Sequence, residues 1–177
     1  LEPAFQDVPE IPLGDPAVGI VALNYHDCIG RHMFWFQDGI RSLKGNFGGT
    51  TASLIDATNS QRALAFWPVN VVAGGEYTIE LRRYPRELNA AISNDIPPGN
   101  PVYDQQSHRS KNGTGFAATS AQLWVGDKKQ SVAVSKDAVT AEFRVTLKKG
   151  SQRLSARFIA ADGRSLDSFY VYARKSK

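Results

Sequence analysis

Residues 76–84, EYTIELRRY, contain the clearest alternation of apolar and polar side chains in this 177-residue sequence. Tyr77, Ile79 and Leu81 fall on one side of an extended backbone, because successive side chains of a strand point to opposite faces. The polar residues between them fall on the other side. This period of two predicts a half-buried β-strand, which ends at Pro85.

Further short strands are predicted on both sides of this segment. Residues 19–25 form one, and residues 63–71 another, in which Pro68 indicates a sheet edge or a bulge because proline cannot donate to the ladder. A turn follows at residues 73–75. The C-terminal part of the chain contains short strand patterns separated by turn signals such as Gly126-Asp127 and Asp162-Gly163, at residues 120–125, 131–134, 141–147, 154–158 and 169–174.

Short alternating strands with closely spaced turns are typical of sandwiches and barrels. We therefore predict an all-β fold, an antiparallel β-sandwich or jelly roll of the galactose-binding-like type. Two long loops, over residues 26–60 and 86–118, interrupt the strands. Residues 18–177 are predicted to form this single domain, preceded by an extended linker over residues 1–17, which contains four of the nine prolines.

The charge balance limits the classes of partner. Lys and Arg number 21 against 17 acidic residues, a net charge of +4. The basic pairs fall near predicted turns and the C-terminus rather than along one aromatic-lined stripe, so we predict no nucleic-acid partner. No apolar stretch approaches the roughly 18–20 residues of a membrane span, so no membrane partner is predicted. A sulfated or acidic carbohydrate could use the positive charge, and the single Cys28 excludes an intrachain disulfide.

Catalytic chemistry is poorly represented in the sequence. The histidines are His26, His32 and His108, and no G-x-S-x-G motif is present. The cluster His26-Asp27-Cys28 offers nitrogen, oxygen and sulfur, but adjacent side chains of an extended chain diverge. We therefore predict no catalytic residue, no metal ligand and no cofactor in this chain. His26 and Asp27 either contact a ligand or anchor a loop.

Binding chemistry is better represented. Trp35 and Tyr84 could stack on a ligand, and Arg82, Arg83 and Arg86 could fork onto carboxylates or sulfates. Arginines are also common where a strand ends on the solvent side, so this segment is either a ligand site or an ordinary rim.

Other aromatic residues offer less specific signals. Trp67, Trp124 and Tyr103 could also provide stacking faces. Trp67 and Trp124 lie within strand patterns, which favours a place in the core for both. The aromatic run Phe34-Trp35-Phe36 could form an apolar patch on a domain that packs against a partner.

Residues 73–85, AGGEYTIELRRYP, resemble a recurring segment in the C-terminal region of bacterial arylsulfatase-type sulfatases. In that family a G-x-Y-x-I-x-L-R-R-[WY]-P strand follows a strand that contains tryptophan, as residues 63–71 do here. The sequence LNYHD at residues 23–27 is similar to the family's leucine followed by His-Asp. The segments 121–127, 141–150 and 154–172 are similar to its closing hairpins.

The resemblance implies an accessory domain rather than a whole enzyme. Sulfatases carry their chemistry in a preceding α/β domain with a Cys-x-Pro-Ser-Arg-like motif and a bound calcium. Here Cys28 is followed by Ile29, Gly30, Arg31 and His32, so it does not match the nucleophile of that motif. The resemblance thus implies a sulfatase catalytic domain as partner, calcium in the parent protein only, and a periplasmic or secreted location.

Three hypotheses follow for function. The first is a non-catalytic accessory β-sandwich that packs on a sulfatase catalytic domain and shapes its substrate cleft. The second is an independent carbohydrate-binding module with Trp35, Tyr84 and the arginines of residues 82–86 on its ligand face. The third is an enzyme built around His26 and Asp27, which would need a nucleophile or metal in the same pocket.

Overall fold

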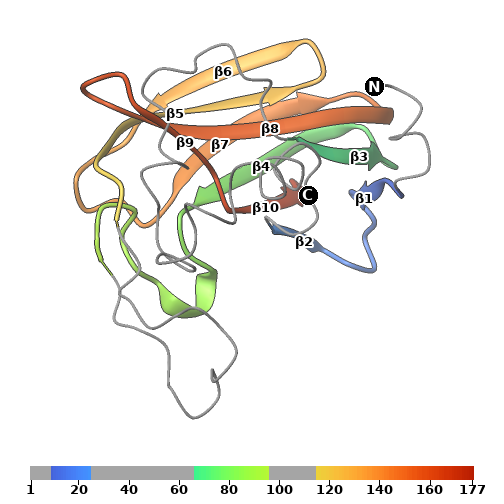
Figure 1. Cartoon of the computed structure of the whole chain (residues 1–177). Helices are drawn as coiled ribbons and strands as arrows, with labels where there is room; N and C mark the ends of the chain where they lie inside the picture. The colour runs from blue at the N-terminus through green and yellow to red at the C-terminus, as the bar shows by residue number, and fades with distance from the viewer. Residues whose placement is uncertain (1–8, 25–65, 96–114) are drawn as a thin grey trace.

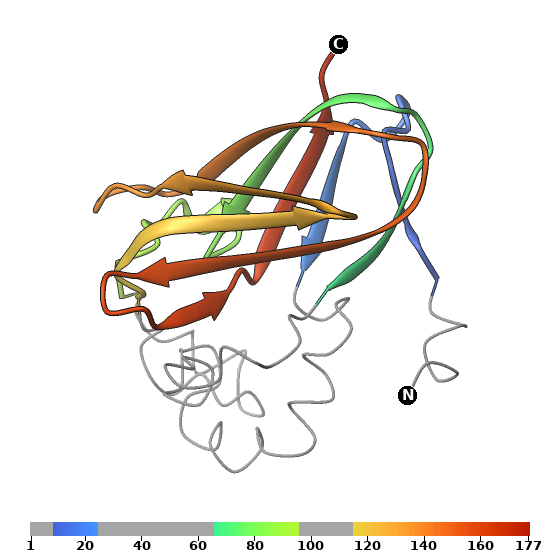
Figure 2. The same cartoon turned by 90° about the horizontal axis from the view of Figure 1, so that it is seen from above.

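The computed structural model describes residues 9–24, 66–95 and 115–177, and the strands in these ranges form two layered sheets (Figure 1, Figure 2). One sheet has the strand order β1-β3-β8-β5-β6, with β9 also paired to β8, and the other has the order β2-β10-β4-β7. We call them the six-stranded and the four-stranded sheet. The six-stranded sheet contains β1 (Ile11–Leu13), β3 (Trp67–Val71), β8 (Gly150–Ala160), β5 (Ala118–Val125), β6 (Lys128–Ala133) and β9 (Ser165–Asp167). The four-stranded sheet contains β2 (Ile20–Asn24), β10 (Tyr170–Lys175), β4 (Gly75–Arg82) and β7 (Ala141–Leu147).

The alternating segment forms the strand that it predicts. In β4 the side chains of Tyr77, Ile79 and Leu81 are fully buried, while the residues between them are only partly covered. β4 pairs antiparallel with β10 on one side and with β7 on the other. The predicted all-β fold, an antiparallel β-sandwich or jelly roll, is therefore confirmed.

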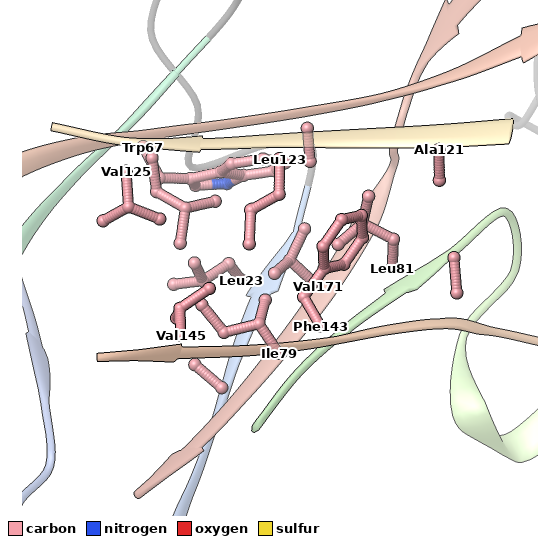
Figure 3. Close-up of a cluster of buried hydrophobic side chains, with 14 of the residues drawn as sticks. Leu23, Trp67, Ile79, Leu81, Ala121, Leu123, Val125, Phe143, Val145 and Val171 are labelled. Atoms are coloured by element: carbon pink, nitrogen blue, oxygen red, sulfur yellow. The ribbon is translucent and has the colours of Figure 1, made fainter. Parts of the chain in front are cut away.

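The core lies between the two sheets (Figure 3). Leu123 and Val125 point down from the six-stranded sheet toward Ile79 and Phe143 of the four-stranded sheet. Trp67 is fully buried, as predicted, and its Nε1 donates a hydrogen bond of 2.7 Å to the backbone carbonyl of Asn24. Since Asn24 belongs to β2, this bond ties the two sheets together across their apolar interior.

The turns divide into two kinds. Gly126 and Gly163 have positive φ and close the predicted hairpins β5–β6 and β8–β9. The turn predicted at residues 73–75 also forms, but it passes the chain from β3 in one sheet to β4 in the other. It is therefore a link between layers rather than a hairpin.

The predicted linker contains a strand. Residues 11–13 lie within the segment expected to be a connector, but they form β1, which pairs in parallel with β3 and buries Leu13 completely. The expectation of an extended linker is therefore wrong for these residues, because a parallel pairing between segments far apart in sequence leaves no local pattern. Pro68 lies just outside the stretch of β3 that β1 covers, as its missing donor requires.

Two side chains of β6 cover an edge strand. Lys128 Nζ donates to the carbonyl of Thr146 at 2.7 Å, and Gln130 Nε2 donates to the carbonyl of Arg144 at 3.3 Å. Both acceptors belong to β7, which ends the four-stranded sheet. Lys128 is thus engaged with the second sheet and protects the β7 edge from pairing with another chain.

The two predicted long loops fall mainly outside the described residues. All of the loop predicted at 26–60 does so, and so do residues 96–114 of the second. The described part of the second loop contains a short 3-10 helix, η3 (Arg86–Leu88). Within the described ranges no helix is long and apolar enough to span a membrane.

Candidate functional site

The outer face of the four-stranded sheet carries part of the predicted arginine site. The Glu80 carboxylate accepts a hydrogen bond from Arg82 Nε at 3.3 Å and another from Arg86 Nη2 at 2.6 Å. Arg86 also lies over the Tyr172 ring at 4.5 Å, and its backbone N–H donates to the Tyr172 hydroxyl at 3.1 Å. The turn after β4 therefore folds back over this face and covers Tyr172, which is buried.

Arg83 and Tyr84 are buried rather than on the solvent side, where the sequence placed them. The Arg83 guanidinium lies 4.5 Å from the centre of the Phe169 ring and 5.0 Å from that of Tyr84. The Tyr84 hydroxyl donates to the carbonyl of Asn94 at 2.6 Å. Burial raises the pKa of Tyr84 above its usual 10.0, although the positive charge of Arg83 opposes this shift.

These contacts show what the arginine segment does within the fold. The structure brings Arg82 and Arg86 together at the Glu80 carboxylate. It buries Arg83 and Tyr84, which lie between these arginines in the sequence. Binding of a ligand by this segment stays a prediction. The other predicted binding residues, His26, Asp27 and Trp35, lie outside the described residues. In the part of the chain that the structure describes, no three His, Cys, Asp or Glu residues gather as a metal site would require.

The outer face of the six-stranded sheet presents a tryptophan. In β5 the side chains of Ala121, Leu123 and Val125 point into the core, so Trp124 points outward and is only partly buried. The expectation that Trp124 belongs to the core is therefore wrong. The alternation in residues 121–125, AQLWV, was the signal that could have placed it correctly.

Cationic groups from both neighbouring strands approach this tryptophan. Trp124 pairs with Lys129 of β6, whose Nζ lies 5.1 Å from the centre of the ring. On the other side, the guanidinium of Arg157 in β8 lies 5.7 Å from the same ring centre. Arg157 also forms an ion pair of 3.7 Å with Asp167 of β9. The ring is thus bordered by two positive charges and one carboxylate.

A second aromatic residue lies on the same face. Phe66 comes one residue before β3, and Arg153 of β8 lies over its ring at 4.6 Å. The register that pairs Trp67 with Leu154 sets Phe66 opposite Ser155 when it is continued by one residue, and Ser155 pairs with Trp124. Two strand spacings therefore separate Phe66 from Trp124, which is about 10 Å.

Uncharged polar groups complete this surface. Gln122 precedes Trp124 on the same side of β5, between Ser131 of β6 and Arg157 of β8. Hydroxyl, amide and guanidinium groups beside partly exposed aromatic rings can hydrogen-bond a polar ligand while the rings pack on its apolar surface. We call the set Phe66, Gln122, Trp124, Lys129, Ser131, Arg153, Arg157 and Asp167, together with the buried Ser155 between the two rings, the tryptophan face.

Comparisons with known proteins do not assign a family. No protein-family model matches the chain, and no curated protein sequence matches it. A ruminal GH26 endo-β-1,4-mannanase structure is similar over 89% of this chain but 26% of its own, at 10% identity and a TM-score of 0.41. A carbohydrate-binding module, CBM6cm-2 from Cellvibrio mixtus lichenase 5A in complex with cellotriose, is similar over 90% of this chain and 99% of its own, at 13% identity and a TM-score of 0.40. Pika GITRL is similar over 63% of this chain and 78% of its own, at 18% identity and a TM-score of 0.29.

The chain therefore spans about a quarter of the mannanase, and TM-scores this low do not bear on its function. The residues of the two outer faces are the observations from which a function can be inferred.

Proposed function

We propose that this β-sandwich is a non-catalytic carbohydrate-binding domain whose ligand lies on the tryptophan face. The observation that carries the proposal is Trp124, a large aromatic ring that the strand alternation turns away from an otherwise well-filled core. A sugar ring has apolar C–H groups on its faces and hydroxyls at its rim. It therefore needs an aromatic surface next to hydrogen-bonding side chains, and this face offers both.

The arrangement of polar groups supports the same proposal. Gln122 and Ser131 face each other on neighbouring strands, two residues along from the Trp124–Lys129 pair. They are within reach of a sugar ring stacked on the indole. The Arg157–Asp167 pair adds donors and acceptors on the other side. Phe66, about 10 Å away across two strands, would contact a second unit of an extended chain.

Binding can be tested with purified domain and a panel of soluble polysaccharides, neutral and acidic, by isothermal titration calorimetry and affinity electrophoresis. We expect binding to at least one polysaccharide, and we expect Trp124→Ala to weaken it at least tenfold, about 1.4 kcal/mol, because tryptophan is enriched among the interface residues whose truncation costs most. Tyr170→Ala is the matched control, since Tyr170 is a half-buried aromatic on the four-stranded sheet. Equal loss in both variants, or no binding to any member of the panel, would contradict the proposal.

Association with a sulfatase catalytic domain remains a separate proposal, based on the resemblance of residues 73–85. It can be checked by asking whether the domain co-purifies with a sulfatase catalytic domain encoded in the same genome. The two proposals are compatible, because a carbohydrate-binding domain beside a sulfatase would hold the substrate chain. A periplasmic or secreted location would suit both.

A further inference from the structure

We infer that the ligand of the tryptophan face is an anionic polysaccharide, one that carries sulfate or carboxylate groups. This inference rests on the proposed function and narrows it to a class of ligand. The observation behind it is the position of the cations relative to the ring. Lys129 and Arg157 lie over Trp124 itself, at 5.1 and 5.7 Å from the ring centre, rather than at the margin of the face.

A ligand that stacks on Trp124 must displace or share these cation–π contacts. A neutral sugar would remove the ring from beside the cations and offer them only hydroxyl groups. A sugar with a sulfate or carboxylate beside its C–H face would give Lys129 and Arg157 a charge-assisted hydrogen bond, which is stronger than a neutral one. With an anionic sugar, these hydrogen bonds therefore compensate for the cation–π contacts that stacking on Trp124 removes.

The distribution of charge on the face is consistent with this ligand. Among the described residues, the cations of this face are Lys129, Arg153 and Arg157, its carboxylate is Asp167, and Glu10 lies beyond it. Asp167 is paired with Arg157, and Glu10 accepts a hydrogen bond from Ser151 at the far end of β8. Lys129 is exposed. Within the described part of the chain, the charged groups beside Trp124 are thus two cations and one carboxylate, and Asp167 pairs with the arginine that lies beside the ring.

A single-stranded nucleic acid is the other ligand class that combines rings with anions. Proteins that bind it generally line a positively charged groove with several stacking aromatics. Here a carboxylate stands beside the arginine nearest the ring, and the uncharged polar side chains of Gln122 and Ser131 lie on the same face. Those groups suit hydroxyl-rich sugars better than a phosphate backbone.

The test uses pairs of ligands that share a backbone and differ in charge. Dextran sulfate is compared with dextran, and polygalacturonate with its methyl ester, each titrated into the whole chain at low and at high salt. We expect each charged member to bind at least tenfold more tightly than its neutral partner. We also expect about tenfold weakening between 50 and 500 mM NaCl, because exposed charges are screened.

Variants separate a built site from general attraction to a basic protein. Lys129→Gln should weaken dextran sulfate binding about tenfold, the loss of one charge-assisted hydrogen bond, whereas Lys129→Arg should retain most of the affinity. Arg144→Gln is the matched control, since Arg144 lies on the four-stranded sheet with a side chain that is 76% exposed. It removes the same net charge elsewhere. Thermal melts check that each variant is folded.

The outcomes distinguish this inference from the proposed function. If neutral and charged members bind equally and Lys129→Gln has no effect, while Trp124→Ala abolishes binding, the anionic class is wrong and carbohydrate binding stands. If no polysaccharide binds, both are wrong. If Arg144→Gln weakens dextran sulfate binding as much as Lys129→Gln does, or if an oligodeoxythymidine binds more tightly than dextran sulfate, the inference is overturned.

Discussion

The two outer faces of the sandwich use the same kinds of side chain in different ways. The four-stranded sheet carries Tyr172 with Arg82, Arg86 and Glu80, and the six-stranded sheet carries Trp124 with Lys129, Arg157 and Asp167. Each set combines a ring, two cations and a carboxylate. On the first face the carboxylate accepts bonds from both arginines, and the ring is buried beneath them.

The second face leaves its ring and one of its cations accessible to solvent. Asp167 engages Arg157 at 3.7 Å, Lys129 is exposed, and Trp124 remains partly accessible. The difference comes from the chain that follows β4, because η3 brings Arg86 back over Tyr172, while none of the described elements is folded over Trp124 in this way. An aromatic residue among charges is therefore a structural anchor where a turn closes over it, and a candidate ligand surface where none does.

Truncating Tyr172 should have the largest effect on stability. Tyr172→Ala removes a buried ring in a central strand and leaves the Arg86 backbone N–H without its hydroxyl acceptor. We expect the free energy of unfolding to fall by about 3 kcal/mol, as for other large-to-small changes at buried aromatic sites. Urea denaturation measures it. Polysaccharide affinity, measured well below the melting temperature, should not change. A loss of affinity would indicate that the ligand binds the four-stranded sheet rather than the tryptophan face.

Neutralising Glu80 should have a smaller effect. Glu80→Gln leaves Arg82 and Arg86 without their shared carboxylate, and we expect a loss of about 1–2 kcal/mol because the three side chains are only partly exposed. Glu142→Gln is the control. Glu142 lies on the same face with a longer contact of 3.9 Å to Arg144, and both are well exposed, so its loss should stay below about 0.5 kcal/mol. Equal effects would mean that the Glu80 cluster is not an anchor.

The buried Tyr84 also predicts a loss of folding stability at high pH. Burial raises the pKa of Tyr84 above 10.0, so above that pH the unfolded chain loses this proton more readily than the folded one. Stability from this group is complete below pH 10 and falls as pH rises through the folded pKa. Tyr84→Phe should cost about 1 kcal/mol at pH 8, because the Asn94 carbonyl loses its donor. The difference from the native protein should shrink above pH 10. A constant difference up to pH 11.5 would contradict the assignment.

Local patterns explain which features could be predicted from sequence. The alternation in β4 predicts its buried side, and the Gly-containing turns predict two hairpins. The same rule applied to residues 121–125 places Trp124 on the outer side, as the structure does. The general tendency of tryptophan to be buried predicts the opposite, and that prediction is wrong here. The burial of Arg83 depends on Phe169, and the pairing of β1 depends on β3. These partners are far away in sequence, so no local pattern indicates them.

Truncating Trp124 should have a smaller effect on stability than truncating Tyr172, although it is the larger aromatic. Trp124 is only partly buried; of its two cations, Lys129 is exposed and the Arg157 side chain is 17% exposed, and each cation–π contact contributes roughly 0.5–1 kcal/mol. We expect Trp124→Ala to lower the free energy of unfolding by about 1–2 kcal/mol, the sum of the two contacts, in the same urea experiment as Tyr172→Ala. A large ring that is partly exposed and contributes less to folding than Tyr172 needs another reason to be there, and ligand stacking supplies one. If Trp124→Ala destabilised the domain as much as Tyr172→Ala, the two faces would be equivalent anchors and that reason would disappear.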